Sequence, residues 1–132
     1  MRRRLDSLEK IATLRKRLHD MAVWRLAELE RQRDALAQDH KAMWSAMGSG
    51  LAAYGQTSAA ALRRILRLEQ EIAAAETACA DQSRQALDQG VKAKLVDRAR
   101  DDLEAKYRDQ RERRELADLI EQTLHKPPSS SA

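Results

Sequence analysis

Three histidines and one cysteine are the side chains of this chain best suited to metal binding or nucleophilic catalysis. His19, His40 and His125 lie far apart in the sequence, and none has a cysteine at metal-ligand spacing. Cys79 would need an adjacent base and an electropositive pocket to react as a thiolate, and residues 77–81 supply neither. The sequence therefore predicts no catalytic, cofactor-binding or metal site, and we expect a protein that is not an enzyme.

Two further features could suggest a phosphate or nucleic-acid ligand. The segment from Gly48 to Gly50 lacks the G-x-x-x-x-G-K-[ST] pattern of a phosphate-binding loop, and no predicted strand precedes it. Basic clusters occupy 2–4 and 15–17, but acidic residues interleave with them and no aromatic residue lies among the first twenty. We therefore expect no nucleic-acid partner.

The composition favours thin helical packing over a globular core. Charged residues make up 35% of the 132 residues, aromatic residues make up 3%, and there is no Phe. Aromatic side chains supply much of the buried area in ordinary cores, whereas a seam of Leu, Ala, Ile and Met between helices needs none. The formal net charge is only +4, and mixed charges of this kind are typical of the solvated faces of coiled coils.

The sequence also bears on cellular location. A single cysteine cannot form an internal disulfide, and the first residues are charged and lack the apolar segment of a secretory signal. No apolar run approaches the roughly 18 residues that a membrane-spanning helix needs. These features predict a cytoplasmic protein without membrane insertion.

Glycine and proline divide the chain into long helical segments, because Gly commonly ends a helix and Pro cannot continue one. The predicted segments are a helix over 5–47, a turn over 48–58, a helix over 59–124 and a disordered tail over 126–132. Within the turn, Thr57 or Ser58 is the expected N-cap of the second helix. The predicted fold is all-α, with residues 1–125 forming one long antiparallel two-helix coiled-coil hairpin whose second helix is longer than the first.

Apolar residues recur at the three- and four-residue steps of a coiled coil. The first predicted helix carries one such series from Ile11 to Met21 and a second, in seven-residue steps, from Ala22 to Met43. We therefore expect a register shift near Ala22. The apolar stripe of the second predicted helix includes Leu62, Ile65, Leu66, Leu68, Ile72, Leu87, Val91 and Leu95.

The second predicted helix outlasts the first. If the chain folds back symmetrically about the turn, about twenty residues overhang, and they end in an apolar stripe made of Leu116, Leu119, Ile120 and Leu124. Either this stripe has an intermolecular partner, or the first helix shifts along the second and covers it. The basic cluster Arg2, Arg3 and Arg4 is either a solubilising start to the first helix or a docking patch for an acidic surface.

Large side chains gather around the turn, namely Trp44, Met47, Leu51 and Tyr54. One interpretation is an apolar plug that closes the tip of the hairpin. The other is a surface that a second protein recognises, because Trp and Tyr are common interface anchors and Met favours adaptable contacts.

Two stretches resemble the FliJ family of flagellar export proteins and its injectisome relative, the YscO family. Residues 65–72 are similar to a family run that reads F-I-x-x-L-E-x-x-I, in which Ile65, Leu68, Glu69 and Ile72 match. The sequence departs from this run at Arg64, where the family often has Phe. The second stretch resembles the charged C-terminal run of the family through Leu103, Tyr107, Gln110, Arg114, Glu115 and Asp118.

The resemblance implies a stalk for the hexameric ATPase of the flagellar type III export apparatus, in contact with the export gate and export chaperones at the cytoplasmic face of the inner membrane. The residues implied at the ATPase end are Arg2, Arg3, Arg4, Leu116, Leu119, Ile120 and Leu124. Those implied at the hairpin tip, toward the gate, are Trp44, Met47, Tyr54, Ile65 and Leu68. The alternative is a generic coiled-coil scaffold or adaptor, homodimeric through the overhang, and the sequence also leaves open whether the system is flagellar or injectisome.

Overall fold

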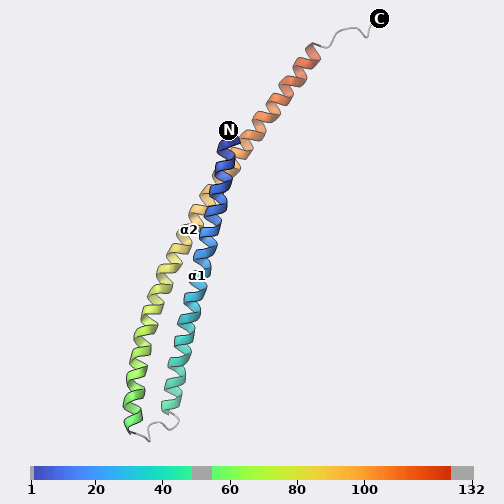
Figure 1. The fold of residues 1–132 in the computed structure, drawn as a ribbon. Coiled ribbons are helices and arrows are strands. Elements are labelled where there is room, and N and C mark those ends of the chain that lie inside the picture. The colour runs from blue at the N-terminus through green and yellow to red at the C-terminus, as the bar shows by residue number, and fades with distance from the viewer. Residues whose placement is uncertain (1, 49–54, 126–132) are drawn as a thin grey trace. The chain divides into compact units, whose positions relative to one another are not determined.

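The computed structural model describes residues 2–48 and 55–125, with the side chains of 55–58 left out of the description. The described residues form two helices, α1 over Arg2–Gly48 with 47 residues and α2 over Gly55–Leu124 with 70 residues. The helices pack against each other in opposite directions, and no strand is present in the described ranges (Figure 1). The predicted all-α hairpin with a longer second helix is confirmed.

The two helix starts differ from those expected from the sequence. α1 begins at Arg2 and α2 begins at Gly55, which is earlier than the expected starts at 5 and 59. The predicted N-cap falls on Thr57 and Ser58, whose side chains lie outside the description. Gly55 can begin the helix because the first four N–H groups of any helix have no partner within it, and glycine is accepted at such an end. Leu51, Tyr54 and the predicted tail over 126–132 lie outside the described residues.

The chain divides into two compact units, and each is described by itself. Unit 1 consists of 1–15 and 92–132, and unit 2 consists of 16–91. Each unit thus contains part of α1 and part of α2.

The seam of unit 2 is a regular heptad pattern on both helices. On α1 the buried or half-buried residues at this spacing are His19, Ala22, Leu26, Leu29, Arg33, Leu36, His40, Met43 and Met47. On α2 they are Ala61, Ile65, Leu68, Ile72, Ala75, Cys79, Gln82, Ala86 and Gln89. The steps alternate between three and four residues throughout, so these residues occupy the a and d positions of a coiled coil. A few residues beside them, such as Leu18, Glu30 and Ala78, are also half-buried.

Unit 1 has a shorter seam of the same kind. The residues of α1 are Leu5, Leu8, Ala12 and Arg15, and those of α2 are Ala93, Val96, Arg100, Leu103 and Tyr107. Figure 1 shows the first residues of α1 beside this part of α2, which then continues past the start of α1.

The expected register shift near Ala22 is wrong, because the burial pattern of α1 keeps one heptad phase on both sides of that residue. Ile11, Leu14 and Met21, which the sequence suggests as seam residues, are exposed by 44%, 56% and 65%. Polar side chains occupy part of the seam in their place. The phase that places Leu26, Leu29, Leu36 and Met43 inside also places Arg15, His19, Arg33 and His40 at the seam.

Polar contacts fix the pairing of the helices in unit 2. The Nε2 of the buried Gln82 donates a hydrogen bond to the carbonyl oxygen of Ala22 across the seam at 3.0 Å. The ring of His19 lies against Gly90, where an added Cβ would come within 3.1 Å of the His19 Nε2. Gly90 therefore makes room for a seam histidine, and the helix runs through it without a break.

Candidate partner-binding surfaces

The end of α2 projects beyond the packed part of unit 1. Tyr107 is the last half-buried residue, and every described residue over 108–125, which we call the overhang, is exposed. The seam ends there because α1 begins at Arg2 and α2 continues past it (Figure 1). The next a and d positions of α2, Gln110, Arg114, Ala117 and Glu121, also form no apolar contact line. The sequence left open whether α1 covers the overhang. The exposure of every described residue over 108–125 favours an overhang that α1 leaves uncovered.

Local ion pairs support the overhang where packing does not. Arg113 Nε lies 3.3 Å from Asp109 Oδ2, and Arg111 Nε lies 3.5 Å from Glu115 Oε1. Both pairs are four residues apart, the spacing that places side chains together on one face of a helix. Each pair stabilises an isolated helix by about 0.3–0.5 kcal/mol.

The predicted apolar stripe of the overhang is present and uncovered in the structure. Leu116, Leu119, Ile120 and Leu124 are exposed by 59%, 59%, 52% and 77%. Leu124 keeps the phase of the seam, whereas the other three lie off that phase. A partner of this stripe would therefore lie against a different face of α2 from the one that α1 occupies.

Unit 1 also carries the excess positive charge of the chain. It contains fifteen Lys and Arg residues against eleven Asp and Glu residues, an excess of four that equals the net charge of the whole protein. Arg2, Arg3 and Arg4 are all exposed in the first turn of α1. Arg3 and Arg4 line an open hollow of about 380 Å³ together with Leu8 and Ile11. This end of the molecule thus combines cations with accessible apolar surface.

The hairpin tip contains part of the predicted surface. Trp44 is exposed by 50% and Met47 is half-buried, whereas Tyr54 lies outside the described residues. Ile65 and Leu68 require a correction, because they are exposed by only 1% and 3%. They occupy a and d positions and pack in the seam, so they are core residues and are not available to a partner while the helices remain paired.

Trp44 belongs to a short chain of polar contacts across the seam. Its Nε1 donates to His40 Nε2 at 3.2 Å, and the same nitrogen of His40 lies 3.2 Å from Glu69 Oε1. The two rings meet edge to face at 6.3 Å between centroids. His40 Nε2 either carries a proton and donates it to Glu69 or accepts from Trp44, so only one of the two bonds is made in each tautomer.

The residues first considered for chemistry lie in the seam or on the surface. Cys79 is buried, and His19 and His40 lie at separate seam positions. Across residues 2–48 and 55–125, no three His, Cys, Asp or Glu side chains gather closely enough to hold a metal ion. Over the same ranges, neither helix has a stretch that is long and apolar enough to cross a membrane.

The seam arginine Arg33 is held by its sequence neighbour. Its Nε and one terminal nitrogen donate to Asp34 Oδ1, each at 3.2 Å. This hydrogen bond, with the charge of Asp34, raises the pKa of Arg33 above its ordinary value. The guanidinium of Arg33 thus keeps a charged partner at the edge of the seam.

Comparison with protein-family models, with curated proteins and with solved structures found no match to this chain.

Proposed function

We propose that this chain is a non-enzymatic coiled-coil component of a type III protein export apparatus, acting as a stalk for the hexameric export ATPase. The observation that carries the proposal is the uncovered apolar stripe of the overhang, made of Leu116, Leu119, Ile120 and Leu124. It projects from a unit that holds the whole positive excess of the chain. The resemblance of two stretches to the FliJ and YscO families supplies the identity of the expected partner.

The physical basis is the fit between a narrow helical surface and a ring. The exposed residues of a single helix point in different directions around its axis. A single helix with an apolar stripe can therefore contact a few ring subunits at a time. Exposed Leu and Ile side chains supply the apolar contact, at about 25 cal/mol per Å² removed from water. Arg2, Arg3 and Arg4 would pair with acidic side chains of the ring, which favours rapid encounter more than final affinity.

The opposite end would meet the export gate and chaperones through Trp44 and Met47. Trp44 offers a half-exposed ring beside the turn, which suits an interface anchor. Ile65 and Leu68 would contribute indirectly, by holding the helices together beneath this surface.

The test is recovery of partners from the native cell lysate with the full chain as bait, followed by mass spectrometry. We expect the export ATPase or a gate component, and we expect removal of 104–132 to abolish recovery of the ATPase. Recovery of unrelated proteins, or of the chain alone, would contradict the proposal and favour a generic scaffold or adaptor. The exposed apolar residues of the overhang would then serve a homodimer.

A further inference from the structure

The two flanks of the seam in unit 2 differ in apolar character. The flank that we call the e/b side carries Val23, Ala27, Ala37 and Trp44 of α1 and Leu62, Leu66, Ala73, Ala80 and Leu87 of α2. All nine residues are exposed. The opposite flank, the g/c side, has only two large apolar residues in unit 2, Leu18 and Met21.

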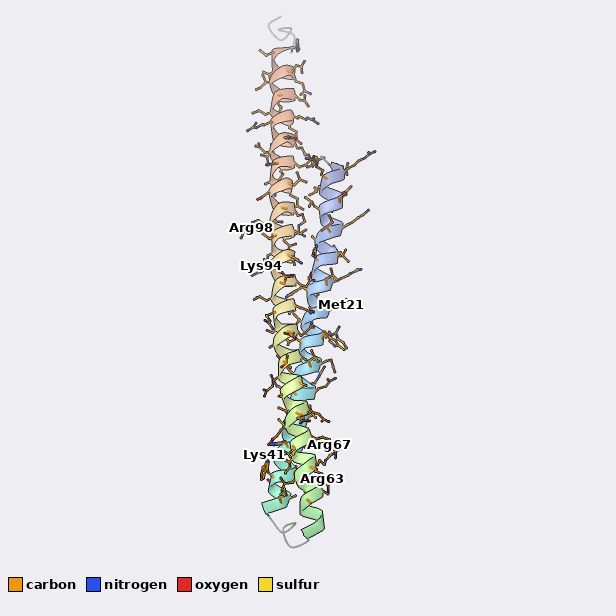
Figure 2. The ribbon with its side chains drawn as sticks, turned by 90° about the vertical axis from the view of Figure 1, so that its left-hand side faces the viewer. Met21, Lys41, Arg63, Arg67, Lys94 and Arg98 are labelled. Atoms are coloured by element: carbon orange, nitrogen blue, oxygen red, sulfur yellow. The ribbon has the colours of Figure 1, made fainter. Side chains whose placement is uncertain are left out.

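The side-chain contacts across the seam agree with this division, and so does the direction in which labelled side chains project (Figure 2). The contact chain from Trp44 through His40 to Glu69 joins e positions of the two helices, which places them on one flank. Figure 2 shows Met21 and Arg67, at c positions, projecting to one side of the paired helices and Lys41, at a b position, to the other.

The e/b side has a regular arrangement of apolar groups. Trp44, Leu62 and Leu66 lie near the tip, and Val23 and Leu87 lie toward the far end of unit 2. Their exposed fractions range from 45% for Val23 to 71% for Leu87. Small alanines occupy the stretch between these two groups, and alanine permits a neighbouring helix to approach closely because it has little side chain to displace.

Acidic residues along the same flank indicate the charge of what binds there. The e and b positions of unit 2 carry Asp20, Glu30, Asp34, Glu69 and Glu76 against only Lys16 and Lys41. Glu30 and Glu76 both occupy e positions, which face each other in an antiparallel pair, and both lie between the contacts Ala22–Gln82 and His40–Glu69.

This pair of carboxylates has no directly bonded counter-ion among the described residues. Neither Glu30 nor Glu76 makes an ion pair within the described part of the chain. Arg33 is an electrostatic neighbour of Glu30, but its guanidinium is bonded to Asp34. Like charges facing each other across two packed strands or helices are unfavourable unless a cation lies between them.

We propose that the e/b side of unit 2 binds a basic amphipathic helix of a partner protein, with its apolar stripe on Leu62, Leu66 and Leu87 and its Lys or Arg side chains on Glu30 and Glu76. The docked helix would run along the hairpin and form a three-helix bundle with α1 and α2. The distance from Val23 to Trp44 along α1 sets its length at about three heptads, or roughly 30 Å. This docking surface includes Trp44, which also belongs to the tip surface. Binding at the e/b side does not depend on whether the overhang enters an ATPase ring.

The test uses the full chain and a synthetic helical peptide of about three heptads, with Leu at a and d and Lys at e and g. A peptide with Glu in place of Lys is the charge control. We expect titration calorimetry to show binding of the Lys peptide and none of the Glu peptide. Glu30→Gln with Glu76→Gln should weaken binding about five-fold, as for two partly exposed charge pairs, and Leu66→Ser should weaken it at least ten-fold.

The g/c side supplies a matched control. Asp39 and Glu71 are acidic residues at g positions of α1 and α2, and neither makes an ion pair among the described residues. Asp39→Asn with Glu71→Gln removes the same charge from the other flank and should leave the affinity within two-fold of the wild type. Equal weakening by both double variants, or equal binding of the Lys and Glu peptides, would overturn the proposal. Concentration-dependent self-association that Leu66→Ser removes, without peptide binding, would also overturn it and assign the flank to a second copy of the chain.

Discussion

Replacement of Ile65 by alanine tests the seam at its most buried point, and replacement of the adjacent Leu66 is its matched control. Ile65 is exposed by 1% and is the only large side chain among the described residues that is fully buried, whereas Leu66 is exposed by 53%. Truncation of a buried Ile to Ala costs about 2–5 kcal/mol, depending on how far the surroundings collapse. Only two helices surround Ile65, and they can close around the gap, so we expect a loss of about 2–3 kcal/mol for Ile65→Ala.

The control substitution Leu66→Ala should leave the free energy of unfolding almost unchanged. Leu66→Ala removes a half-exposed side chain at a surface position, where substitutions usually change stability by less than about 0.5 kcal/mol. Alanine also has a slightly higher helix propensity than leucine, which offsets part of the lost contact.

Urea unfolding followed by circular dichroism measures both changes in the free energy of unfolding. A well-folded domain has only about 5–15 kcal/mol in total, so the expected difference between the two variants is readily resolved. Equal losses for Ile65→Ala and Leu66→Ala, or a larger loss for Leu66→Ala, would refute the seam register. Such a result would mean that the heptad phase differs from the one described.

Three further predictions concern the polar seam and the overhang. Gly90→Ala should stabilise the protein more in a His19→Ala background than in the wild type. Helix propensity favours Ala by about 1 kcal/mol, but in the wild type the new Cβ would lie 3.1 Å from the His19 ring. Thermal unfolding of the four proteins measures both effects, and additive changes in stability would contradict the contact. Gln82→Leu should leave the free energy of unfolding unchanged or raise it, because the carbonyl of Ala22 keeps its backbone hydrogen bond within α1. Gln82→Glu should lower the free energy of unfolding by about 3 kcal/mol, because it buries a carboxylate. Denaturant titration that ranks these two variants in the reverse order would contradict the burial of Gln82. Removal of 108–132 should leave the unfolding midpoint of the hairpin nearly unchanged, because every described residue of that stretch is exposed, and a large fall in the midpoint would show that the overhang is packed.

The fold class was accessible from the sequence because its signals are local. Clustered glycines between two long stretches that lack proline and contain only Gly90 as a further glycine predict a hairpin, and the low aromatic content excludes a thick core. The start of α2 was less accessible. The capping rule favoured a start just after Thr57 and Ser58, whereas α2 begins at Gly55.

The heptad phase of the first part of α1 was the main feature that the sequence did not predict. The expected series from Ala22 to Met43 does lie in the seam, whereas Ile11, Leu14 and Met21 are exposed, and spacing alone does not choose the face that this first part turns toward α2. The choice depends on pairing with α2, where Ile65 and Leu68 are buried and Leu66 is exposed. Continuity of one phase from Leu5 to Met47 was a usable signal, but it required accepting Arg15, His19, Arg33 and His40 at the seam.

A different error affected the candidate surfaces. The resemblance implied a gate contact for Ile65 and Leu68, although both belong to the apolar stripe predicted for the second helix, and the structure buries them in the seam. The overhang was predicted well, because its apolar stripe follows from spacing and from the unequal helix lengths. The e/b side could not be found without the phase, because its alanines and leucines look like seam residues until the true seam is known.

The most direct test of the proposed function is the turnover rate of the purified hexameric export ATPase as this protein is added. The proposal predicts that the wild-type chain raises the rate to a plateau, and that Leu116→Ser with Ile120→Ser abolishes the increase. Met21→Ser, which alters an exposed apolar residue of unit 2 outside both proposed binding surfaces, should keep the increase. An unchanged rate with the wild-type chain, or an increase that survives Leu116→Ser with Ile120→Ser and is lost with Met21→Ser, would contradict a stalk that acts through the overhang.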